Sequence, residues 1–182
     1  MTSTPLLFDA TTLIALGTVG ELDLVTHFDG IPVVLPTVRG EITTEPERTN
    51  VDRLVSNEGV ETDVWLPMTT DPSTDEFDSP AREILGEQER NGDVAIVASV
   101  LARTDVDLPI GVVSDDQRVR TVSRGLGATV TGTIGVIVRA VDAELSAEVG
   151  KEIVRDVDGH GLHMTGELRE KAFDLIDDAA TD

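Results

Sequence analysis

Short apolar runs alternate along the chain with segments in which apolar residues recur every three or four positions. The runs are typical of buried parallel strands and lie at 6–8, 31–35, 64–66, 110–113 and 128–130. The periodic segments between them predict helices. Strands that alternate with helices favour a parallel sheet covered on both faces. We therefore expect a three-layer α/β/α fold with about five parallel strands.

Individual residues predict where several of these elements begin and end. Gly17 is expected to cap the helix that starts at Thr11, because glycine readily adopts the left-handed conformation of a helix end. Pro36 is expected to open a helix that runs to Ile42. Segment 93–102 is so apolar that it predicts a buried helix, whereas 68–79 is rich in turn-forming and acidic residues and predicts a loop.

Length and composition predict one globular domain. The 182 residues contain no repeat and no long linker, so we expect a single domain over 1–182, with 146–182 as a C-terminal helical extension. The chain has no cysteine, which excludes disulfides, thiolate metal sites and a cysteine nucleophile. No apolar run approaches the roughly 18 residues of a membrane span. The first residues lack the basic start of a signal peptide, so a cytoplasmic location without membrane association is expected.

The net charge is extreme for a folded domain. Asp and Glu number 35 against 14 Lys and Arg, which gives −21 at pH 7, and Lys151 and Lys171 are the two lysines. The acids are dispersed along the chain, so their mutual repulsion opposes folding in ordinary salt. We interpret this surface as an adaptation to a salt-rich cytoplasm, that is, to a halophilic host. The charge then says little about binding partners.

Four short acidic motifs carry most of the information about chemistry. Asp9 and the pair Asp115–Asp116 directly follow predicted strands, whereas Glu41 and Asp93 fall on helix-like segments. Each acid alone has an ordinary explanation, as a helix cap, a turn residue or a solvated side chain. Together they would converge at the carboxyl edge of the sheet, where open α/β folds bind ligands. Such carboxylates need a cation to stay ionised together, so a site for Mg²⁺ or Mn²⁺ is predicted.

Two hydroxyl residues accompany these acids. Thr11 and Ser114 stand beside Asp9 and Asp115, where they can hydrogen-bond a carboxylate or a metal-bound water. Serine and threonine are also simply favoured near helix starts, so this pattern alone leaves both interpretations open.

The ordered set of motifs resembles the PIN domain, a family of metal-dependent nucleases that includes toxin ribonucleases of type II toxin–antitoxin pairs. The resemblance rests on Asp9 and Thr11 in FDATTLI, Pro36 to Glu41 in PTVRGE, Asp93 in DVAIVA, and Ser114 with Asp115–Asp116 in SDD. The following VTGTIG is similar to one archaeal and bacterial branch of the family. Two alignments stay open, because Glu87 and Glu89 compete with Asp93 and either Asp115 or Asp116 can supply the last acid.

The resemblance implies metal-dependent endoribonuclease activity of the toxin type. It assigns Asp9, Asp93 and Asp115 or Asp116 to the metal, with Glu41 orienting a water molecule or completing the coordination. RNA is then the substrate, a cognate antitoxin and a second copy of the chain are expected partners, and Arg118, Arg120 and Arg124 are candidate phosphate contacts. Two alternatives remain: the arginines are ordinary exposed helix residues, and the whole chain is a non-catalytic PIN-like interaction module.

The acidic surface predicts a steep dependence of stability on salt. Raising KCl from about 0.1 M to about 1 M shortens the Debye length from about 10 Å to about 3 Å, which screens most of the repulsion. The midpoint of thermal or urea unfolding should therefore rise strongly over this range. A flat response would show that the surface is no adaptation of this kind.

Overall fold

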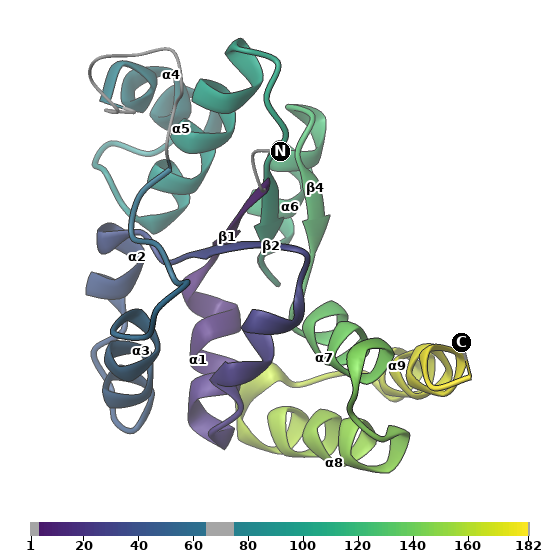
Figure 1. Cartoon of the computed structure of the whole chain (residues 1–182). Helices are drawn as coiled ribbons and strands as arrows, with labels where there is room; N and C mark the ends of the chain where they lie inside the picture. The colour runs from purple at the N-terminus through teal and green to yellow at the C-terminus, as the bar shows by residue number, and fades with distance from the viewer. Residues whose placement is uncertain (1–3, 65–74, 182) are drawn as a thin grey trace.

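A parallel sheet forms the centre of the protein. The structure is a computed structural model that describes residues 4–64 and 75–181. Strands β1 (Thr4–Phe8), β2 (Gly30–Val33), β3 (Gly111–Val113) and β4 (Thr129–Thr131) pair in the order β2-β1-β3-β4. All three pairings are parallel, and Figure 1 shows the strands between helices. The predicted three-layer parallel fold is confirmed.

The described sheet has four strands rather than five. The expected strand at 64–66 begins at Val64, which lies outside any strand, and residues 65 and 66 lie outside the described residues. Instead, Glu61 pairs in parallel with Val33 as an isolated bridge, and it exchanges backbone hydrogen bonds of 2.9 Å with Pro32 and Val34. A short contact of this kind extends the β2 edge without forming a further strand in the described chain.

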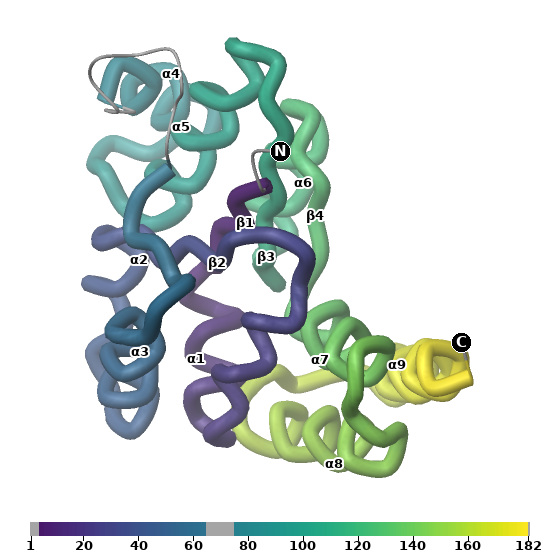
Figure 2. The backbone as a smooth tube through the Cα atoms, viewed as in Figure 1, coloured from purple at the N-terminus to yellow at the C-terminus, as the bar shows by residue number. Residues whose placement is uncertain are grey.

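Helices cover both faces of the sheet. They are α1 (Ala10–Val19), η1 (Leu22–His27), α2 (Pro36–Glu41), α3 (Glu47–Val55), η2 (Asp75–Phe77), α4 (Asp78–Leu85), α5 (Gly92–Asp105), α6 (Gln117–Gly125), α7 (Thr133–Ala143), α8 (Ala147–Val157), η3 (Asp158–Leu162) and α9 (Gly166–Ala179). Helices α1 and α7 pack with α8 and α9, whereas α5 packs with α4 and α6. The tube in Figure 2 shows these two groups on either side of the strands. Because β1 leads outward to β2 and β3 leads outward to β4, right-handed crossovers place α1 and α6 on opposite faces.

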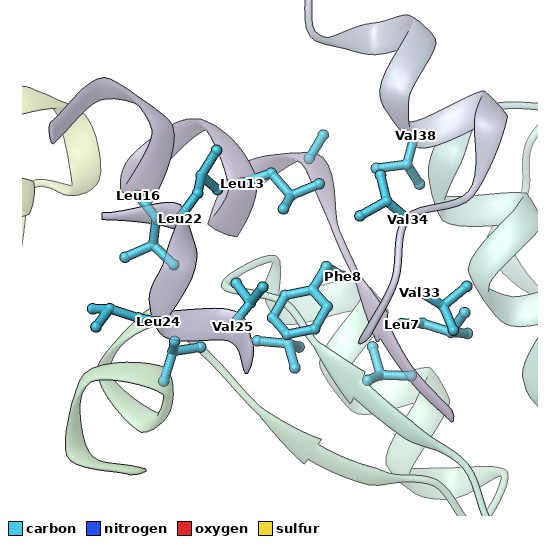
Figure 3. Packing of buried hydrophobic residues seen from close by; sticks show 14 of the residues in the cluster. Leu7, Phe8, Leu13, Leu16, Leu22, Leu24, Val25, Val33, Val34 and Val38 are labelled. Carbon is cyan, nitrogen blue, oxygen red and sulfur yellow. The ribbon is translucent and has the colours of Figure 1, made fainter. Parts of the chain in front are cut away.

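The main hydrophobic core includes buried residues from both faces of the sheet, with α1 and α7 contributing on one side and α5 and α6 on the other. Leu7 and Phe8 of β1 and Leu13 and Leu16 of α1 are at most 1% exposed, and Figure 3 shows them packed with residues of η1 and β2. The ring of Phe8 meets that of Phe28 edge to face, with centroids 6.4 Å apart. This packing fixes the direction in which β1 delivers the next residue, Asp9.

Two local expectations were wrong for identifiable reasons. Helix α1 does not end at Gly17, which is buried and packs against Glu47; it continues to Val19 and ends at Gly20, whose φ is 81°. Within the expected loop at 68–79, residues 75–79 are helical, in η2 and the start of α4. The rest of that segment lies outside the described residues.

The C-terminal segment is helical and shares the main core. Helix α8 contributes Ile153, Val154 and Val157, and α9 contributes Ala172 and Ile176. Figure 1 shows α8 beside α1 and α7, and α9 beside α7, with the C-terminus far from the N-terminus. Across the described ranges, no helix combines the length and the apolar character that crossing a bilayer requires.

Substitution by alanine should change the stability of the protein in opposite directions at two glycines, Gly30 in the close pairing of β1 with β2 and Gly40 in α2. A Cβ at Gly30 would stand 2.6 Å from the carbonyl oxygen of Thr4 and 2.8 Å from Cγ of Leu6. Gly30→Ala should therefore lower the free energy of unfolding by about 1–3 kcal/mol, as overpacking commonly does. Gly40 in α2 has open space at the same position, so Gly40→Ala should raise it by up to about 1 kcal/mol. Urea unfolding measures both, and a Gly30→Ala protein of unchanged stability would contradict this strand packing.

Candidate functional site

Asp9 occupies the carboxyl end of β1 and is 2% exposed. Its Oδ2 accepts hydrogen bonds from Ser114 Oγ at 2.6 Å and from Thr11 Oγ1 at 2.8 Å. Asp9 stands at the N-cap position of α1, yet its side chain makes no capping hydrogen bond. Capping therefore does not explain this buried carboxylate, whose hydroxyl partners bring no compensating charge.

Ser114 ties the ends of β1 and β3 together. It is fully buried, and its Oγ accepts a hydrogen bond from the backbone N–H of Asp116 at 3.1 Å while it donates to Asp9. On the other side, the Oγ1 of Thr11 accepts from the N–H of Asp115 at 3.4 Å while it donates to Asp9. The two predicted hydroxyl residues thus lie between the acids of the two strands and hold the Asp9 carboxylate in place.

Asp93 lies in the first turn of α5 and faces the same edge. The cap of α5 is Asn91, whose side chain accepts from the N–H of Val94 at 2.9 Å, so Asp93 is not the capping residue. Burial raises the pKa of Asp93, and the negative charges of Asp9 and Asp116 raise this pKa further, against the opposing effect of Arg118. Asp9 and Asp116 are therefore both close enough to Asp93 to act on it electrostatically.

Arg118 neutralises Asp93 in this structure. Its Nη2 donates to Asp93 Oδ2 at 2.9 Å, and its Nη1 lies 2.8 Å from Glu87 Oε1 and donates to the carbonyl oxygen of Leu85 at 3.2 Å. Of the two acids that compete with Asp93 for the third motif, Glu87 therefore lies at this ion pair. Glu89 is exposed.

Glu41 reaches the start of α5 from the end of α2. Its Oε1 accepts a hydrogen bond from the N–H of Gly92 at 2.5 Å. A Cβ at position 92 would stand 2.7 Å from Oε2 of Glu41, so a glycine is needed there for this approach. Glu41 thus stabilises the positive end of the α5 dipole, one residue before Asp93.

Asp115 is engaged by the start of α7. Its Oδ1 accepts from the N–H of Thr133 at 3.0 Å, and its Oδ2 accepts from the hydroxyls of Thr133 and, at 3.4 Å, Thr12. A Cβ at Gly132 would overlap Oδ1 of Asp115, and one at Gly135 would overlap the Thr131 side chain. The VTGTIG motif therefore makes room for Asp115.

Asp116 is the N-cap of α6. Its Oδ1 accepts from the N–H of Val119 at 2.9 Å, as the ordinary explanation of this position requires. Its charge nevertheless contributes to the raised pKa of Asp93. Of the two acids that the sequence leaves open, Asp116 is therefore the one with an identified electrostatic effect on Asp93.

The three candidate phosphate-binding arginines have different surroundings. Arg118 forms the ion pairs with Asp93 and Glu87. Arg120 is half-buried and donates from Nη1 to the carbonyl oxygen of Ser114 at 2.7 Å. Arg124 is exposed in the last turn of α6. Of the three, Arg118 and Arg120 lie at the acidic edge.

The donor set suits a hard divalent cation. Asp9, Asp93 and Asp116 offer carboxylate oxygens, which Mg²⁺ and Mn²⁺ prefer. Burial and the negative charges of Asp9 and Asp116 raise the pKa of Asp93, and a bound cation would oppose these effects. Within residues 4–64 and 75–181, in the side-chain positions of this structure, no three His, Asp or Glu side chains are grouped closely enough to hold a metal ion. Sharing of one cation by these acids stays a prediction.

The sequence analysis did not identify the residues that leave space for the acidic side chains or donate hydrogen bonds to them. Gly92 admits Glu41, Gly132 admits Asp115, and Thr12 and Thr133 donate to Asp115. The sequence analysis noted the VTGTIG motif, which contains Gly132 and Thr133, but assigned no role to its residues. No local signal in the sequence connects Gly92 with Glu41, because the two meet only through the packing of α2 on α5.

Comparison with known proteins identifies one family. A family model described as a PIN domain (DUF3368) matches residues 5–178, which is nearly the whole chain. Neither the curated proteins nor the solved structures gave a match.

The ion pair of Arg118 with Asp93 predicts a measurable change in titration. Arg118 holds down the pKa of Asp93 that burial raises, so in Arg118→Gln this pKa should rise further. A carboxyl whose folded pKa is raised binds its proton more tightly in the folded protein, so stability falls as pH rises from about 3.9 through the folded pKa. That fall should be larger in the mutant. Carbon-detected NMR of the carboxyl and urea unfolding across this pH range, both in chelator, measure the two effects.

Arg124→Gln is the matched control on the same helix. It removes the same charge away from Asp93, so the titration of Asp93 should stay at the wild-type pKa. Equal behaviour of the two mutants would show that the ion pair does not act on Asp93.

Proposed function

Because this chain belongs to the PIN-domain family, we propose that it is a divalent-metal-dependent endoribonuclease. PIN domains have a nuclease-type fold, and this family supplies the reaction class: hydrolysis of a phosphodiester bond in RNA. The observation that carries the proposal is the geometry at the carboxyl ends of β1 and β3, where Ser114 Oγ joins the buried carboxylate of Asp9 to the backbone of Asp116. The charges of Asp9 and Asp116 also raise the pKa of Asp93.

The proposed ligands are Asp9, Asp93 and Asp116. Asp9 is supported by its burial and by the two hydroxyls that bind only its Oδ2, which leaves Oδ1 for a cation. Asp116 is preferred to Asp115, because both oxygens of Asp115 accept hydrogen bonds from Thr133 or Thr12. Asp93 would exchange Arg118 for the metal ion.

The remaining residues position these groups. Ser114 and Thr11 fix the orientation of the Asp9 carboxylate, as hydrogen-bond partners behind metal ligands commonly do. Glu41 holds the N-terminus of α5 and so sets the position of Asp93. When bound, Mg²⁺ or Mn²⁺ would lower the pKa of a water molecule and stabilise the charge that develops on the phosphate. A cysteine or serine nucleophile is then unnecessary.

The displaced Arg118 would gain a second role. If Asp93 bound a cation instead, the guanidinium would still be held by Glu87 and by the carbonyl oxygen of Leu85, which it contacts in this structure. It would then lie beside the reacting phosphate, where its planar fork can bind two phosphate oxygens. The position of Arg118 at Asp93 supports its proposed role as a phosphate contact.

The toxin role, a cognate antitoxin, a homodimer and a cytoplasmic location remain predictions of the family resemblance. Light scattering of the purified chain tests the dimer, and co-expression with the neighbouring gene product tests the antitoxin. The alternative function is a PIN-like interaction module without catalysis. It predicts that Mn²⁺ raises the melting temperature no more than KCl of equal ionic strength does.

Asp9→Asn tests the nuclease directly. The asparagine side-chain oxygen can still accept from Ser114 and Thr11, so the fold should persist and the metal-free protein should gain slight stability as one repelling charge is lost. Metal binding loses its buried anion, so the rise in melting temperature with Mn²⁺ should disappear. Cleavage of RNA should fall by more than the roughly 100-fold that losing a hydrogen-bond partner of a metal ligand costs. Thermal melts with and without Mn²⁺ and cleavage of a labelled RNA measure these effects.

Asp29→Asn is the matched control. Asp29 precedes β2 at the opposite end of the sheet, its side chain is 92% exposed and it pairs with Arg139. The mutant removes the same charge and should keep the Mn²⁺ response and the cleavage rate of the wild type. Wild-type behaviour of Asp9→Asn would remove Asp9 from the site and with it the nuclease proposal.

A further inference from the structure

A cleft opens beside the acidic edge, on the side of β4. It has a volume of about 480 Å³, within the range of about 300–1,000 Å³ that ligand pockets occupy. Its walls come from the start of α6, the loop from β4 to α7, and α9. Figure 1 shows α7 and α9 side by side beyond the end of β4. Asp115 lines the cleft directly before Asp116, so the cleft adjoins the proposed metal site.

The cleft gathers positive charge on a strongly negative molecule. Arg120 and Lys171 line it from α6 and α9, although the chain carries a net charge of −21. Among its described lining residues, Asp115 is the only acid, and Thr133 and Thr12 already donate to both of its oxygens. Lys171 forms no ion pair with any described residue. Most other cations of the described chain lie against a carboxylate or a ring; Lys151, for example, contacts both Asp177 and Phe173.

Arg120 is fixed in direction. Its Nη1 donates to the carbonyl oxygen of Ser114 at 2.7 Å, and it lies 2.8 Å from the position that a Cβ of Gly132 would take. A guanidinium has five N–H donors, so the hydrogen bond to Ser114 uses one of them and leaves others for a ligand in the cleft that Arg120 lines. An anion bound there would meet a donor that is already oriented, which reduces the entropy lost on binding.

Helix α9 supplies an apolar wall next to Lys171. Leu168, Ala172 and Leu175 recur at helical spacing on the side that lines the cleft, and the two leucines are 45% and 41% exposed. A ribose or a base can pack against such a surface while its phosphate meets the cations. This combination of cations and apolar surface suits one nucleotide of a single strand.

We propose that this cleft binds a backbone phosphate of the RNA strand, through Arg120 and Lys171, next to the phosphate that is cleaved. The inference rests on the proposed nuclease function and adds the direction in which the strand leaves the metal site, across β4 toward α9. It also assigns a role to α9: this C-terminal helix forms one wall of the substrate path.

Lys171→Ala tests the proposal by equilibrium binding. A fluorescein-labelled, single-stranded RNA is titrated in chelator, so that binding is measured without cleavage, at salt concentrations where circular dichroism shows folded protein. Each phosphate contact contributes about 0.7 to the slope of log K against log salt for a single strand. Lys171→Ala should weaken binding and lower that slope by about 0.7, and Arg120→Gln should act in the same direction.

Lys151→Ala is the matched control. It removes the same charge from the α8 side, where Lys151 pairs with Asp177, and should leave affinity and slope at the wild-type values. If Lys171→Ala and Lys151→Ala bind RNA equally well, the proposal is overturned.

The presence of two lysines permits a direct second measurement. Acylation by an amine-specific reagent, read by peptide mass spectrometry, compares Lys171 with Lys151 in one sample of wild-type protein. RNA should protect Lys171 several-fold and leave Lys151 unchanged. Equal labelling with and without RNA would overturn the proposal, and protection of Lys171 by a co-expressed protein but not by RNA would assign the cleft to a protein partner.

The two proposals fail separately. If Asp9→Asn loses Mn²⁺-dependent cleavage while Lys171→Ala binds RNA like the wild type, the proposal for the cleft is wrong and the nuclease proposal stands. If RNA protects Lys171 but the protein cleaves no RNA with Mn²⁺, RNA binding in the cleft is supported and the nuclease proposal is wrong.

Discussion

The hydrogen bond from Ser114 to Asp9 holds the acidic edge together. It joins the ends of the two central strands across 105 positions of sequence, is buried and measures 2.6 Å. Parallel pairing of β1 with β3 brings Phe8 opposite Val113, so the residues that follow both strands emerge at one edge. The same Oγ accepts from the backbone of Asp116, which places the start of α6 relative to Asp9. A buried carboxylate needs such donors, because an unsatisfied one is costly.

Three acids at this edge also hold helix N-termini. Glu41 binds the first N–H of α5, Asp116 caps α6, and Asp115 binds the first N–H of α7. Helix N-termini carry partial positive charge, which makes it less costly to keep several carboxylates together. These acids therefore have a structural role. Both oxygens of Asp115 accept hydrogen bonds, whereas Asp9 makes no capping hydrogen bond and Asp93 is paired with Arg118.

The distribution of cations follows from the same electrostatics. With 35 acids against 14 Lys and Arg, many cations of the described chain lie next to a carboxylate, as Arg118 lies next to Asp93 and Glu87. A cation that lines an open cleft without such a partner can bind an anionic ligand there. Arg120 and Lys171 are in that position, one on each wall of the cleft beside Asp115, and the C-terminal helix brings the second of them there.

The sequence by itself determined the layers, most strand positions and the acids at the strand ends, because apolar periodicity and the residue that follows a strand are local properties. The family could also be recognised from the sequence, since its motifs keep their order along the chain.

Tertiary structure alone decided which partner each acid takes. Arg118 meets Asp93 and Glu41 meets Gly92 through packing of distant helices, and the clash-free space at Gly132 singles out Asp115 for α7. The end of α1 at Gly20 rather than Gly17 has the same origin: burial of Gly17 against Glu47 extends the helix beyond its local stop signal. Contacts between residues far apart in sequence leave no periodic trace, so only the folded chain determines them.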